Sequence, residues 1–203
     1  MSHEIALLEA SLDGGFAQPV FEAQATFRLV MDAMARPGSC RRIEADVTAP
    51  GLAGSAQAAL ALTLCDADTP VWCSNDVSPA LGAWLAFHTG APLTENPAQA
   101  AFVFIGRGGV MPNDAPLGSQ DYPDRSATLI IEVRHFGEGE RFRLTGPGID
   151  GHCDIVIDGL PEGFVAFRAA NRALFPRGLD VVLTAGSELV GLPRSTHFIP
   201  SED

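Results

Sequence analysis

The sequence predicts an α/β domain in which helices pack on the faces of a mixed sheet. Two observations support this prediction. Helical and strand-like segments alternate through the first half of the 203-residue chain, and strand-like segments cluster in the second half. Such a succession of elements is typical of a layered α/β architecture. The chain shows no internal repeat and no linker between two hydrophobic cores, so residues 1–203 are expected to form one domain.

The first helix is expected over residues 22–35, "EAQATFRLVMDAMA". Four of its apolar side chains recur at helical spacing and predict one buried stripe: Phe27, Val30, Met31 and Met34. The helix should end at Arg36, because a residue that precedes a proline avoids the helical conformation.

Three further helices are expected along the chain. "SAQAALALTLC", residues 55–65, should begin with Ser55 as its N-cap, and "SPALGAWLAFHTG", residues 78–90, with Ser78 as its N-cap. The last helix is expected over residues 161–174.

Apolar, β-branched and aromatic runs predict the strands. They lie at residues 39–44, 69–74, 101–106, 127–136, 140–148, 153–157, 179–184 and 188–193. The run at 140–148 alternates apolar and polar residues, and it should pair with 127–136 through the connecting "GEG".

Charge and hydropathy exclude several classes of protein. The formal net charge is −12 and all 13 cationic side chains are arginines, so the chain should repel nucleic acid and cannot form a Schiff base through a lysine. No uninterrupted apolar stretch reaches the roughly 18–20 residues that a membrane span needs. Hydrophobic residues make up 46% of the chain and charged residues only 19%, so part of the surface should be covered by a partner, in the isolated chain by a second copy in a homodimer.

The four cysteines indicate reduced thiols in a cytoplasmic protein, because no C-x-x-C pair and no signal peptide is found. Metal binding by Cys65, Cys73 and His88 is conceivable, but the spacing fits no common zinc motif. We favour buried, small hydrophobic cysteines, and predict neither a metal site nor a cofactor.

Two polar stretches could act on a small molecule. Asp66 and Asp68 could hold Mg²⁺ or act as acid and base, but aspartate is also ordinary in a helix-to-strand turn, which we favour. Residues 107–126 are rich in proline, glycine and aspartate and lack periodicity. They form either an interaction or lid loop or a simple surface excursion.

The stretch "LPRSTH", residues 192–197, combines a cation, two hydroxyls and an imidazole. On an extended strand, Ser195 and His197 would point to one face and Arg194 and Thr196 to the other. Three interpretations stay open: a nucleophile beside its base, an anion-binding corner made by these four residues, or polar anchoring of a strand end or interface. No G-x-S-x-G elbow supports a nucleophile, so no catalytic residue is assigned.

Taken in order, six stretches resemble the PhnH family of subunits of bacterial carbon–phosphorus lyase, and they span nearly the whole length. These stretches are "FRLVMDAMARPG" (27–38), "LTLCDADTPVW" (62–72), "FHTGAPL" (87–93), "RLTGPGI" (143–149), "FPRGLDVVLT" (175–184) and "LPRSTH" (192–197).

The resemblance implies a three-layer α/β/α fold like the large domain of pyridoxal-phosphate-dependent transferases, without that cofactor. It implies a core complex with PhnG, PhnI and PhnJ. That complex displaces adenine from ATP with an alkylphosphonate to give ribose 1-alkylphosphonate 5-triphosphate, and PhnJ then breaks the C–P bond. The family has no established catalytic residues in this subunit, so none carry over.

We therefore expect a non-catalytic, accessory subunit. The alternative is a stand-alone enzyme or binding protein that acts on a phosphorylated substrate through Arg194 and His197 with Asp66 and Asp68.

Overall fold

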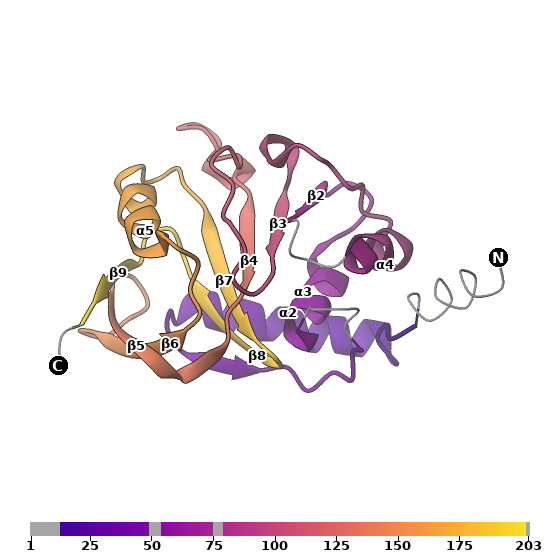
Figure 1. Cartoon of the computed structure of the whole chain (residues 1–203), viewed down its shortest axis with the longest axis horizontal. Helices are drawn as coiled ribbons and strands as arrows, with labels where there is room; N and C mark the ends of the chain where they lie inside the picture. The colour runs from indigo at the N-terminus through magenta and orange to yellow at the C-terminus, as the bar shows by residue number, and fades with distance from the viewer. Residues whose placement is uncertain (1–12, 49–53, 75–78, 202–203) are drawn as a thin grey trace.

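The computed structural model describes residues 13–48, 54–74 and 79–201. A six-stranded sheet crosses the centre of the molecule in the order β1-β8-β7-β4-β3-β2, and a second sheet has the order β6-β5-β9 (Figure 1). The strands are β1 (Cys40–Arg42), β2 (Val71–Cys73), β3 (Phe102–Ile105), β4 (Thr128–Glu132), β5 (His135–Thr145), β6 (Cys153–Asp158), β7 (Asp180–Ala185), β8 (Glu188–Leu192) and β9 (His197–Pro200).

Four helices are described: α2 (Pro19–Ala35), α3 (Ser55–Leu64), α4 (Pro79–Thr89) and α5 (Phe164–Ala173). Strands β2, β3, β4 and β7 are parallel, while β8 and β1 run antiparallel at one edge. The expected α/β domain with a mixed sheet is confirmed. None of the described helices is both long and apolar enough to cross a membrane.

Each face of the large sheet has its own hydrophobic core. On one face, Phe104, Ile130 and Val182 pack against α2, α3 and α4. On the other face, the small sheet and α5 cover the large sheet (Figure 1), through residues that alternate inward along their strands. The inward residues of the strands are Phe142, Leu144, Ile155, Ile157 and Phe198, and α5 contributes Phe164. The third layer is therefore a small antiparallel sheet with one helix, and not the layer of helices that we expected.

The expected hairpin between residues 127–136 and 140–148 is wrong. Strand β4 pairs with β3 and β7 in the large sheet, whereas β5 pairs with β6 and β9 in the small one. The "GEG" segment is a bulge within β5, because Phe136 and Glu140 both pair with Ile157. Gly139 has φ +102°, and a Cβ atom there would lie 2.5 Å from the Ile157 carbonyl oxygen, so the bulge needs glycine at this position.

Helix α2 buries a different face from the one predicted. Val30 is buried as expected, but Phe27 and Met31 are 48% and 56% exposed, and the other buried side chains are the small Thr26 and Ala33. The reason lies in β8: an added Cβ at Gly191 would lie 2.7 Å from the backbone of Ala33, so helix and strand touch backbone to backbone. Small side chains therefore face the sheet at this contact, and Phe27 and Met31 face outward, while the predicted Met34 is half-buried against the core.

Two other expectations concern the first residues of helices, and one strand was not expected. The N-cap of α3 is Gly54; Ser55 is its first helical residue, and its hydroxyl donates to the Gly186 carbonyl. Ser78 lies outside the described residues. Strand β9 was not expected, because its short run carries no alternating pattern.

We predict that Gly191→Ala destabilises the fold by about 1–3 kcal/mol, because the new methyl group would meet the backbone of α2, which cannot move without leaving the sheet. Urea unfolding would measure the loss. Gly82→Ala is the matched control: it lies inside α4, and its methyl would meet only the tip of Leu93, at 3.2 Å. Equal stability of Gly191→Ala and wild type would contradict the backbone contact.

Candidate functional site

The stretch 192–197 is a turn and not a continuous strand. Leu192 ends β8, His197 begins β9, and the Thr196 amide donates to the Pro193 carbonyl at 3.0 Å to close the turn between them. The strand geometry that would have put Ser195 and His197 on one face is therefore wrong, and the arrangement of a nucleophile beside its base loses its support.

Arg194 is the centre of a structural clasp. Its Nε donates to both carboxylate oxygens of Asp180 at 3.2 Å, and its backbone amide donates to the same carboxylate at 2.8 Å. One terminal nitrogen donates to the carbonyls of Pro123 and Pro176, and the other donates to Ser126 Oγ and to Asp180. All five guanidinium N–H groups thus have acceptors within the chain. These contacts support the anchoring interpretation, while the anion-binding role of Arg194 stays a prediction.

The clasp joins three segments that are distant in sequence. Arg194 connects the turn at 192–197 to residues 176–180, which lead from α5 into β7, and to the end of the 107–126 stretch. That stretch is further held where Ala127 donates to Pro116 and Gly178 donates to Leu117. Its second half is therefore packed against the domain.

A second arginine holds the same turn from the side of the helix. Arg168 on α5 is 1% exposed and donates to the carbonyls of Leu192, Pro193 and Thr196 at 3.3, 2.7 and 3.1 Å. Burial lowers its pKa to about 10, and the charge of Asp180 opposes that shift. Arg168 therefore keeps its charge at neutral pH.

The other three predicted residues of the turn, Ser195, Thr196 and His197, differ in their exposure to solvent. Thr196 is fully buried, and His197 is exposed at the start of β9. Partial desolvation and the positive charge of Arg172 lower the pKa of His197, so its imidazole is neutral at pH 7. Ser195 is half-buried within the turn.

The aspartate pair lies far from this corner. Asp66 and Asp68 form a local turn before β2: the Asp68 amide donates to Asp66 Oδ1 at 3.0 Å, and the Asp66 amide donates to Thr69 Oγ1 at 2.7 Å. Strands β7, β4 and β3 separate β2 from β8 in the sheet. The structure therefore does not bring the aspartates together with Arg194 and His197.

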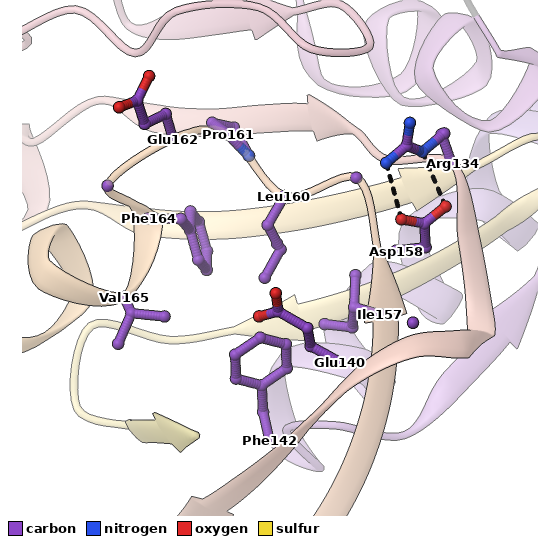
Figure 2. Close-up of a pocket in the computed structure, with 13 residues that line it drawn as sticks. Arg134, Glu140, Phe142, Ile157, Asp158, Leu160, Pro161, Glu162, Phe164 and Val165 are labelled. Atoms are coloured by element: carbon purple, nitrogen blue, oxygen red, sulfur yellow. Dashed lines mark hydrogen bonds and ion pairs between the residues drawn. The ribbon is translucent and has the colours of Figure 1, made fainter. Parts of the chain in front are cut away.

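A cavity of about 370 Å³ opens between the small sheet and the start of α5. Figure 2 shows the carboxylate of Glu140 above the ring of Phe142, and the ion pair between Arg134 and Asp158 on the other side. Sequence analysis missed this cavity. One feature of the sequence could have indicated it. Glu140 precedes Phe142 by two residues in β5, so its charged side chain lies on the same face of the strand as the buried Phe142.

The cysteines do not form a metal site in the part of the chain that is described, where no group of three or more candidate ligands gathers. All four cysteines are free. Burial raises the pKa of both Cys65 and Cys73 to about 12, so these thiols stay protonated at neutral pH.

We predict that Arg194→Ala lowers the free energy of unfolding by about 2–4 kcal/mol, because it leaves a largely buried Asp180 without its partner. Trypsin should also cleave faster after Arg125, next to the clasped Ser126. Arg143→Ala is the control: its ion pair with Asp154 is exposed and should contribute less than about 1 kcal/mol. Unchanged stability and proteolysis of Arg194→Ala would contradict the clasp.

We predict that Ellman's reagent at pH 8 modifies Cys40 before Cys65 and Cys73, because Cys40 is exposed, whereas Cys65 is buried, Cys73 is half-buried and burial keeps both of these thiols protonated. Peptide mass spectrometry would locate the modified sites. Fast reaction of all four thiols in the folded protein would contradict this arrangement.

Comparison with known proteins identifies the family. A model of the bacterial phosphonate metabolism protein PhnH matches residues 14–199. The chain is 47% identical over 188 residues to the alpha-D-ribose 1-methylphosphonate 5-triphosphate synthase subunit PhnH of Rhizobium meliloti (strain 1021), covering 91% of this chain and 94% of that protein. It is 42% identical over 82 residues to the "Putative C-P lyase subunit protein HtxG" of Stutzerimonas stutzeri, covering 40% and 42% of the two chains. The chain belongs to the PhnH family of bacterial phosphonate metabolism proteins.

Proposed function

We propose that this chain is an accessory, non-catalytic subunit of a carbon–phosphorus lyase complex. In that role it supports the formation of ribose 1-methylphosphonate 5-triphosphate from ATP and methylphosphonate. The observation that carries the proposal is the 47% identity to a synthase subunit along 94% of that subunit. Identity over nearly a full chain supports a shared role as well as a shared fold.

The site geometry agrees with a subunit that does no chemistry of its own. The guanidinium of Arg194 is fully engaged within the domain, and His197 lies away from Asp66 and Asp68. The alternative of a stand-alone enzyme needs these groups to act on one substrate. Their separation across the sheet therefore favours the accessory role.

The outer face of α2 is the surface that we assign to assembly. Val20, Phe27 and Met31 are spaced seven and four residues apart, so they form one stripe, and they are 78%, 48% and 56% exposed. A groove of about 620 Å³, which these three side chains do not line, runs along another side of the same helix and carries both Arg28 and Glu44. Exposed apolar stripes of this kind mark protein–protein interfaces.

A groove with charges of both signs suits a two-fold contact between copies, in which each arginine can face a glutamate of the other copy. We therefore propose a homodimer when the chain is alone. With PhnG, PhnI and PhnJ present, the same apolar stripe is re-used for one of these partners.

Two finer features complete the proposal. The central mixed sheet is related to that of the large domain of pyridoxal-phosphate-dependent transferases, although a small sheet and α5 form its third layer. The domain does not carry the cofactor; the absence of lysine from the sequence supports this, since no side chain can form an internal aldimine. The protein works in the cytoplasm, a location that suits its four free thiols.

Co-expression tests the function. The tagged chain should co-purify with PhnG, PhnI and PhnJ, and omission of the chain should reduce formation of the triphosphate product from ATP and methylphosphonate. The isolated chain should convert neither compound. Conversion by the isolated chain, or full activity of the other subunits without it, would contradict an accessory role.

We predict that the double variant Phe27→Glu and Met31→Glu is monomeric and loses at least about tenfold in co-purified partners, because it places charge in an apolar contact. Its unfolding midpoint should stay close to that of the wild type, since both side chains are exposed. Light scattering and quantitative pull-down measure the effects. Phe87→Glu, at an exposed phenylalanine of α4, is the matched control and should assemble normally. A dimeric double variant that still captures the partners would exclude α2 as the interface.

A further inference from the structure

A groove of about 410 Å³ lies between helix α5 and the first half of the 107–126 stretch, and we call it the loop groove. Its walls are largely apolar. Val110 and Met111 contribute to the wall formed by the stretch, while Phe167 and Leu174 contribute to the wall formed by α5 and its end. Val110 is 80% exposed and the other three side chains are half-buried, so a ligand can reach their apolar atoms from solvent.

The wall formed by the stretch also leaves its backbone available. No hydrogen bond joins residues 110–114 to another described residue, whereas Pro116 and Leu117 are bonded to the domain through their carbonyl groups. Backbone N–H and C=O groups need partners, and an extended peptide offers donors and acceptors that can replace water along such a segment. A small apolar molecule would displace that water without replacing its hydrogen bonds. The groove therefore suits a peptide segment better than a small apolar molecule.

The charges at one end of the loop groove are negative. Glu162 lines both this groove and the cavity of about 370 Å³ beside the small sheet, so the two hollows adjoin there. Figure 2 shows Glu140 within that cavity, and neither glutamate forms an ion pair with a described residue. Among the described residues that line the two hollows, Arg134 is the only cation, and it is paired with Asp158.

This excess of negative charge is not balanced by the fold. Helix α5 begins at Phe164, and the start of a helix carries a partial positive charge of about half a unit, which offsets only part of two carboxylates. A second copy of this chain would bring a further net charge of −12. A basic segment from another protein is therefore the complementary occupant.

We propose that the loop groove receives an extended segment of another subunit of the complex. Apolar side chains of that segment pack against Val110 and Phe167, and an arginine or lysine beside them reaches Glu162 and Glu140. The inference rests on the proposed accessory function, because it needs a partner chain. It adds a second contact surface, since α5 and α2 pack on opposite faces of the large sheet.

Co-purification of the tagged chain, co-expressed with PhnG, PhnI and PhnJ, tests the groove. Val110→Glu places a charge on the apolar rim, and Glu162→Arg reverses the charge at the acidic end. Each should lower the amount of at least one co-purified subunit by about tenfold or more. Both positions are exposed, so light scattering should still show the wild-type oligomeric state, and unfolding midpoints show that each variant is folded.

The matched control is Glu95→Arg, which makes the same charge reversal at an exposed position next to Thr94, whose amide is bonded to β2 at the far edge of the sheet. This variant should co-purify with the partners like the wild type. An equal loss in Glu95→Arg would show a general effect of charge and overturn the groove.

Photo-crosslinking gives an independent readout that needs no loss of binding. With benzoylphenylalanine in place of Val110, ultraviolet light should join the chain to a partner subunit, and peptide mass spectrometry should map the link to a segment in which a basic residue adjoins apolar ones. Full retention of the partners by both groove variants, or a cross-link only to a second copy or to an acidic segment, would overturn the groove and leave the accessory function standing. A wild-type chain that captures no subunit would overturn both.

Discussion

Two arginines hold the turn between β8 and β9 in place, and the position of the small sheet depends on their hydrogen bonds. Arg194 ties the turn to β7 and to the 107–126 stretch, while Arg168 ties it to α5. This turn leads into β9, which pairs with β5 and so fixes the small sheet over the large one. One short segment therefore contacts a loop, a helix and the second sheet. Arg194 belongs to this segment, and Arg168 reaches it from α5.

The two arginines do this work under different electrostatic conditions. Arg194 faces the carboxylate of Asp180, whose side chain is only 23% exposed, and this ion pair and the neutral acceptors satisfy every donor of the guanidinium. Arg168 lies in the interior, and its hydrogen bonds to described residues all go to backbone carbonyls, so its charge is solvated by the backbone but not neutralised by a direct ion pair. In a chain with a net charge of −12, the buried guanidinium of Arg168 is a local reversal of sign.

Local periodicity was enough to predict most helices and strands and the mixed sheet, because those depend on patterns within a few residues. The errors arose where the deciding partner is distant in sequence. The exposed Phe27 follows from Gly191, and the turn at Arg194 is held by Asp180, Pro123 and Ser126. The burial of Arg168 and its hydrogen bond to the Thr196 carbonyl likewise depend on tertiary contacts that no local pattern shows.

The large sheet separates α2 from the contact between α5 and β9. Helix α2 packs on one face through Val30 and Ala33, and α5 with β9 packs on the other through Phe164 and Phe198. A partner bound to the outer side of α2 would therefore leave the solvent side of Arg172 and His197 open. Because β8 touches α2 at Gly191 and ends in the turn that Arg168 holds, it contacts both regions. A displacement of α2 that leaves β8 in place should therefore leave the turn and β9 unchanged.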